Sequence, residues 1–125
     1  MVSDGASIPR IFWIAYPPLD GKYRLGAVIH DYYCDTKTRT WKDTHRVFYD
    51  ALKTSEVDEI TAKGMYAAVY NFGRRWGPGV ASRGPGGMKA MTLEQEETAM
   101  NDIKSWIKKE NPSLEQIEQR LENEQ

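Results

Sequence analysis

Helical periodicity is clearest in residues 41–53, which read Trp41-Lys42-Asp43-Thr44-His45-Arg46-Val47-Phe48-Tyr49-Asp50-Ala51-Leu52-Lys53. The residues that repeat on one side at helical spacing are Trp41, Thr44, Val47, Phe48, Ala51 and Leu52. Such spacing is typical of an amphipathic helix with one face toward a core. Thr40 can accept a hydrogen bond at the start of this helix, and Asp43 in its first turn suits the positive end of the helix dipole. The sequence therefore predicts a helix over residues 41–53.

Two more helices are expected beside it. Residues 23–35 are apolar on most sides, which predicts a buried helix, although a strand remains an alternative for residues 25–29. Residues 55–58 resemble a capping box and predict the start of a third helix, which Gly73 can end. The apolar stripe of this third helix is Val57, Ile60, Met65, Val69 and Phe72.

The C-terminal part predicts an amphipathic helix over residues 92–109, with Thr92 as its cap and Gln95 at the reciprocal position. Asn111-Pro112 breaks the helical pattern, and Ser113 begins a short final helix. Residues 1–22 are expected to be irregular or extended, because proline and glycine interrupt them repeatedly.

The fold class predicted from these patterns is mainly α. An irregular N-terminal loop packs on a three-helix core, and a C-terminal helical arm follows. The corresponding divisions are a helical domain over residues 1–77, a Gly/Pro-rich linker or loop over residues 78–91, and an acidic amphipathic arm over residues 92–125.

Composition narrows the classes of protein. The chain has 125 residues and a net charge of −1, which gives no bias toward nucleic acid, and binding to nucleic acid is not expected. The single cysteine, Cys34, excludes an internal disulfide and fits a reducing compartment. We expect no membrane span and no export signal. Residues 1–91 carry net charge +4 and residues 92–125 carry −5, so the acidic tail could dock on the body of the same chain, reach a basic partner or stay solvated.

Two polar segments border apolar runs. The first is Asp4-Gly5-Ala6-Ser7-Ile8-Pro9-Arg10, in which Asp4, Gly5, Ser7, Pro9 and Arg10 form the polar turn, and the second is His30-Asp31. Polar groups in such places are costly to bury without partners. They therefore form either a hydrogen-bonded knot that ties the N-terminal loop to the helices or a functional site.

These two segments, with Ile11-Phe12-Trp13 after the first and Tyr32 after the second, resemble a family of tailed phages and prophages that is catalogued as domain of unknown function 1353. The resemblance covers about residues 2–77 and implies a phage or prophage origin. Three departures from the family pattern stand out. Extended segments that usually precede the motif are missing, Cys34 occupies a position that is often tyrosine, and His45 stands three residues before Phe48, where an aspartate is usual.

The His-Asp pair is also similar to the layout of secreted phospholipases A2. That similarity implies His30 as a general base, Asp31 as a ligand of calcium, and His45 in the place of the orienting carboxylate. Two imidazoles in that arrangement would either share a proton or both bind a metal. Asp31 and His45, with Asp4, could thus hold a divalent metal such as calcium or zinc. Against this, adjacent residues on a helix point about 100° apart, so His30 and Asp31 do not readily clasp one ion.

Structural interpretations compete with the functional ones. His45 is expected to be an exposed or partly satisfied helix residue, and Trp41, Phe48 and Trp76 to be core residues. The arginines that are expected to be solvated are Arg74, Arg75 and Arg83.

The favoured function is that of a small phage interaction or assembly protein without its own catalysis or cofactor, tied to the virion tail or to host takeover. It would act in the bacterial host cytoplasm or in the virion. The apolar face expected to bind a protein partner or a second copy consists of Leu93, Met100, Ile103, Trp106 and Ile107, although the body of the same chain could also cover it. The alternative function is a metal-assisted ester hydrolase.

Overall fold

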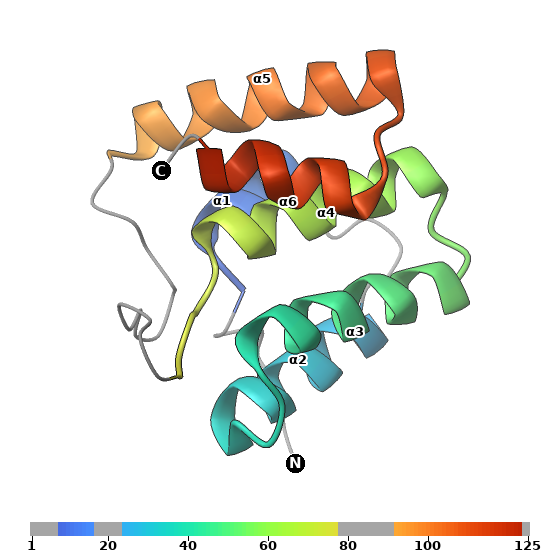
Figure 1. Ribbon diagram of the computed structural model, residues 1–125, viewed down its shortest axis with the longest axis vertical. Helices are drawn as coiled ribbons and strands as arrows, with labels where there is room; N and C mark the ends of the chain where they lie inside the picture. The colour runs from blue at the N-terminus through green and yellow to red at the C-terminus, as the bar shows by residue number, and fades with distance from the viewer. Residues whose placement is uncertain (1–7, 17–23, 78–91, 124–125) are drawn as a thin grey trace.

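A computed structural model describes residues 8–16, 24–77 and 92–123. These residues form a mainly α structure of six helices, with no strand among them (Figure 1). The helices are α1 (Arg10–Ala15), α2 (Arg24–Thr36), α3 (Trp41–Thr54), α4 (Glu59–Phe72), α5 (Leu93–Glu110) and α6 (Leu114–Asn123). The prediction of a mainly α protein is confirmed.

Helix α4 is the centre of the described structure. It packs against α1, α3, α5 and α6, and almost every residue from Ala62 to Phe72 is buried. Small residues such as Ala67 and Ala68 let the neighbouring helices approach closely on several sides. The single apolar stripe that the sequence predicts for this helix is therefore too narrow, because even Lys63 and Asn71 are buried.

The start of α4 differs from the predicted capping box. Asp58 is the N-cap, and its carboxylate accepts a hydrogen bond from the backbone N–H of Thr61 at 3.0 Å. Ser55 instead follows the last residue of α3 as its C-cap. The predicted caps at Thr40 and Gly73 are confirmed, since Thr40 accepts from the backbone N–H of Asp43 and Gly73 ends α4.

Helix α1 lies within a segment that the sequence predicts to be irregular. It begins directly after Pro9, whose ring pre-sets the backbone angle of a helix start. Ile11 and Phe12 are 1% exposed, so burial of two large side chains stabilises a helix of only six residues. Periodicity cannot reveal so short an element between prolines.

Helix α2 packs against α3 and against no other helix of the described structure (Figure 1). The two helices approach closely at Gly26, where a Cβ atom would lie 3.0 Å from the ring of Phe48. The sequence predicts that this helix is buried on most sides, and that prediction is wrong. Leu25 is 49% exposed and Tyr32 is 45% exposed.

Helices α5 and α6 both begin at capping boxes, and α5 also ends at a defined cap. Thr92 and Gln95 form the predicted capping box, and Asn111 ends α5 in the left-handed conformation at φ 44°. Ser113 and Gln116 exchange side-chain-to-backbone hydrogen bonds at the start of α6. The fully or almost fully buried side chains of the two helices, which join the same core cluster as α1–α4, are Met100, Ile103, Ile107, Ile117 and Leu121.

Within the described ranges, no helix combines the length and the apolar character needed to cross a bilayer.

Candidate functional site

The contact between α2 and α3 brings the two histidines of the chain together. His30 and His45 are both 0% exposed, and their rings stack with centroids 4.9 Å apart and planes 14° apart. Nε2 of His30 lies 2.8 Å from Nδ1 of His45. The expectation that His45 is exposed or only partly satisfied is therefore wrong. Its position on α3 faces α2, where Trp41 and Phe48 enclose the two rings.

The partner of His45 on the segment after α4 fixes the positions of the protons in the pair. The carbonyl oxygen of Arg74 can only accept, so Nε2–H of His45 donates to it at 3.1 Å. In a neutral imidazole the other nitrogen then accepts, so Nδ1 of His45 receives the Nε2–H of His30. Nδ1 of His30 is left as an acceptor, and the thiol of Cys34 lies 3.5 Å from it. The result is a directional chain from Cys34 through both rings to the backbone.

Burial favours the neutral form of this chain. It lowers the pKa of His30 to about 4, because an imidazolium would lose its hydration in the interior. The carboxylate of Asp31 acts in the opposite direction, and the charge of Arg74 acts in the same direction as burial. His30 is therefore uncharged at neutral pH.

The predicted metal set is not assembled in the part of the chain that the structure describes. No group of three or more His, Cys, Asp or Glu side chains in that part could hold an ion. The 2.8 Å contact between the rings leaves no space for a metal between them. Of the two arrangements expected for paired imidazoles, the rings adopt the one in which they share a hydrogen bond. Asp31 is buried beside them, and Asp4 lies outside the described residues.

Cys34 is the member of this cluster that the sequence reading missed. The sequence analysis treats it as the single cysteine and as a departure from the family pattern, yet it is 0% exposed and contacts His30. The signal that could have found it is the spacing of four residues, which places His30 and Cys34 on the same face of a helix.

The N-terminal motif is described only from Ile8 onward, so the predictions for Asp4, Gly5 and Ser7 lie outside the described residues. Arg10 donates from Nε and Nη2 to one oxygen of Glu96, at 3.1 and 2.5 Å. Glu96 is 2% exposed, so the motif arginine neutralises a buried carboxylate of α5.

The sequence predicts that the arginines after α4 are solvated, but the two that the structure describes, Arg74 and Arg75, have partners within the protein. The guanidinium of Arg75 is buried, lies 4.1 Å from the ring centroid of Trp41 and donates to the carbonyl oxygen of Tyr70 at 3.0 Å. Burial lowers the pKa of Arg75, and Glu122 of α6 opposes that effect from 3.5 Å. Arg74 forms an ion pair with Asp35, while Arg83 lies outside the described residues.

The five residues predicted to bind a partner fall into two groups. Met100, Ile103 and Ile107 are covered by the body of the same chain and are not available to a second protein. Leu93 is 36% exposed, and Trp106 is half-buried beneath the guanidinium of Arg120.

Because His30 is buried, the stability of the protein should depend on pH, and this dependence can be tested. In the unfolded chain His30 takes up a proton near pH 6.5, whereas in the folded protein it does so only near pH 4. The contribution of neutral His30 to the free energy of unfolding is therefore complete above pH 6.5. It is lost as pH falls toward 4, by about 1 kcal/mol per pH unit. We expect urea unfolding between pH 6.5 and 5 to show this slope, before most carboxylates titrate. The variant His30→Gln should show a smaller slope; an unchanged slope would contradict the assignment.

A sequence model of a family described as protein of unknown function (DUF1353) matches residues 1–69. An uncharacterized protein y4iH of Sinorhizobium fredii (strain NBRC 101917 / NGR234) is 52% identical over 77 residues, which are 60% of this chain and 32% of that protein. An uncharacterized protein y4jT of the same strain is 50% identical over 74 residues, which are 58% of this chain and 22% of that protein. The similarity thus spans about a third or less of these curated relatives. No solved structure matches the chain.

Proposed function

Because this chain belongs to the DUF1353 family, whose description specifies no activity, we propose its function from its own surface: it is a non-catalytic interaction protein that self-associates through the outer face of α2. The outer face of α2 is defined here as Leu25, Val28, Ile29 and Tyr32. The resemblance to a family of tailed phages and prophages supports a role in virion assembly or host takeover, in the host cytoplasm or the virion.

The observation that carries this proposal is the exposure of an apolar stripe two helical turns long. Leu25 and Tyr32 are 49% and 45% exposed, and Val28 and Ile29 between them are half-buried. The spacing of three, four and seven residues places all four on one side of the helix. The opposite side is buried against α3. A contiguous exposed apolar face of this kind marks an interaction surface.

A second copy of the chain fits this face because no charge opposes the contact. The outer face of α2 contains no ionisable group except the phenol of Tyr32. Asp31 is buried on the inner side, and Asp35 at the end of the helix is paired with Arg74. An antiparallel two-fold contact would place Leu25 of one copy against Tyr32 of the other, with Val28 and Ile29 at the centre. Identical surfaces are then complementary.

The test is the oligomeric state in solution. We expect sedimentation equilibrium to show a dimer, and the variants Leu25→Glu and Tyr32→Glu to raise the dimer Kd by about a hundredfold, because each buries a carboxylate in an apolar contact. The matched control is Ile14→Glu on α1, where the replaced side chain is 47% exposed and should leave the dimer unchanged. A monomeric wild-type protein, or a dimer indifferent to both α2 variants, would refute the proposal.

The hydrolase alternative has no comparable support. A general base needs a free nitrogen that can reach a water molecule. His30 is 0% exposed, and both of its ring nitrogens are in contact with neighbouring side chains.

A further inference from the structure

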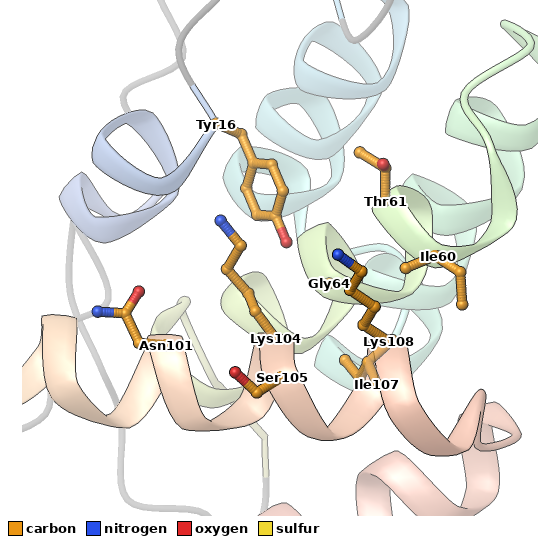
Figure 2. A pocket seen from close by; sticks show the side chains of 9 residues that line it. All are labelled: Tyr16, Ile60, Thr61, Gly64, Asn101, Lys104, Ser105, Ile107 and Lys108. Atoms are coloured by element: carbon orange, nitrogen blue, oxygen red, sulfur yellow. The ribbon is translucent and has the colours of Figure 1, made fainter.

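A cleft of about 370 Å³ lies between the end of α1, the first half of α4 and the middle of α5 (Figure 2). None of its lining residues comes from α2 or α3, so it is separate from both the histidine pair and the outer face of α2. Its volume is within the range of small-ligand sites. The cleft is therefore large enough for a compact organic molecule.

Two lysines of α5 bring positive charge to this cleft. Lys104 and Lys108 are one helical turn apart, and Figure 2 shows their ammonium groups on either side of the hydroxyl of Tyr16. Lys104 Nζ lies 4.7 Å from the ring centroid of Tyr16 and 3.4 Å from the carbonyl oxygen of Ala15. Among the residues that the structure describes, neither lysine forms an ion pair with a carboxylate. No carboxylate of the described residues therefore pairs with either charge.

Two carboxylates at the start of α4 have partners of their own. The carboxylate of Asp58 caps α4 through the backbone N–H of Thr61, and Glu59 forms an ion pair with Lys63. The cleft also offers the hydroxyl groups of Thr61 and Tyr16. Burial, and after it the negative charge of Asp58, raise the pKa of Tyr16 far above its ordinary value, so its phenol keeps its proton at physiological pH.

Gly64 shapes the floor of the cleft. A Cβ atom at this position would lie 2.0 Å from the hydroxyl oxygen of Tyr16, so only glycine lets the phenol sit against α4. The apolar side chains of Ile60 and Ile107 complete the lining. The walls therefore combine a cationic rim with an apolar interior, which is the arrangement that suits an amphipathic anion.

We propose that this cleft binds a small organic anion, with its oxyanion group between Lys104 and Lys108 and its apolar part against Ile60. Carboxylates and phosphate monoesters share this chemistry. Lysine recognises either as a point charge, while the hydroxyl groups of Thr61 and Tyr16 add hydrogen bonds. The inference is independent of self-association through α2.

The test uses four probes of similar shape: phenyl phosphate, benzoate, benzyl alcohol and benzylamine. We expect saturable NMR shift changes at Gly64 and Ser105 with one or both anions, and not with the neutral or cationic probe. The variant Lys108→Gln should raise the Kd of the anion about tenfold, since one charge-assisted hydrogen bond is lost. Lys108→Arg should restore most of the affinity.

The matched control is Lys109→Gln, which removes the same charge one residue along α5, outside the cleft. Phenyl phosphate alone, benzoate alone or both would support the proposal and would identify the head group. The proposal is overturned if neither anion binds, if benzyl alcohol binds equally well, or if Lys109→Gln weakens binding as much as Lys108→Gln. Circular dichroism of each variant confirms that the fold is retained.

Discussion

Removal of residues 92–125 is expected to abolish cooperative folding. Helices α5 and α6 contribute five almost fully buried aliphatic side chains, namely Met100, Ile103, Ile107, Ile117 and Leu121. Burial of each is worth about 1.5–3 kcal/mol, so their combined loss is comparable to the entire stability of a typical domain, about 5–15 kcal/mol. The truncated chain should lack a sigmoidal thermal transition.

The same truncation also removes the carboxylates that pair with α3, α4 and the segment after it. Glu118 accepts hydrogen bonds from Nε of Arg46, at 2.8 Å, and from the hydroxyl of Tyr66. Glu122 accepts from the hydroxyl of Tyr70 at 2.8 Å. Loss of these acceptors would leave polar groups of the core unpaired. This cost adds to the free energy that is lost with the buried apolar side chains.

Point variants make this prediction quantitative within the full chain. Ile117→Ala should lower the free energy of unfolding by about 2–4 kcal/mol, because a fully buried side chain leaves a cavity. Leu93→Ala, at a position 36% exposed, should cost less than about 1 kcal/mol. The interpretation fails if residues 1–91 unfold cooperatively at the melting temperature of the whole protein.

Replacement of His45 by leucine is expected to cost about 3–4 kcal/mol of stability. The change leaves the Nε2–H of His30 and the carbonyl oxygen of Arg74 without the partner that each has in the intact chain. A buried polar group that loses its partner carries its full desolvation cost. Chemical denaturation monitored by circular dichroism measures the loss.

A double-mutant cycle separates the hydrogen bond from simple packing. The variant with both His30→Leu and His45→Leu should be more stable than the sum of the single changes predicts, by about 1–3 kcal/mol, because it removes both ends of the shared bond. The control is Thr44→Val, next to His45, where a buried hydroxyl has no hydrogen-bond partner within the described residues. Its replacement should leave stability almost unchanged. Additive effects of the two histidine changes would contradict the hydrogen-bonded pair.

Local signals predicted the helices well. Thr40, Gly73 and the Thr92–Gln95 box sit at helix ends because their side chains or backbone freedom act within one turn. Helix α1 escaped prediction because Ile11 and Phe12 stabilise it through long-range burial, which no local pattern reports.

Long-range geometry limited the prediction of the site. The sequence showed that His30 and His45 lie on neighbouring helices, yet the depth of both rings depends on how closely α2 approaches α3 at Gly26. The burial of Arg75 was equally hidden, because its partner Glu122 lies 47 positions farther along the chain and its charge alone favours the surface. Charge asymmetry between the two parts of the chain was the only hint of that docking.

The ion pairs of Arg10 with Glu96 and of Arg46 with Glu118 show that the family match and the folded unit have different limits. The family match ends at residue 69, three residues before the end of α4. Arg10 and Arg46 lie within the matched part, whereas the carboxylates that neutralise them lie beyond it. Replacement of α5 and α6 would remove both of these carboxylates, so the C-terminal helices are part of the same folded unit as the family-matched residues.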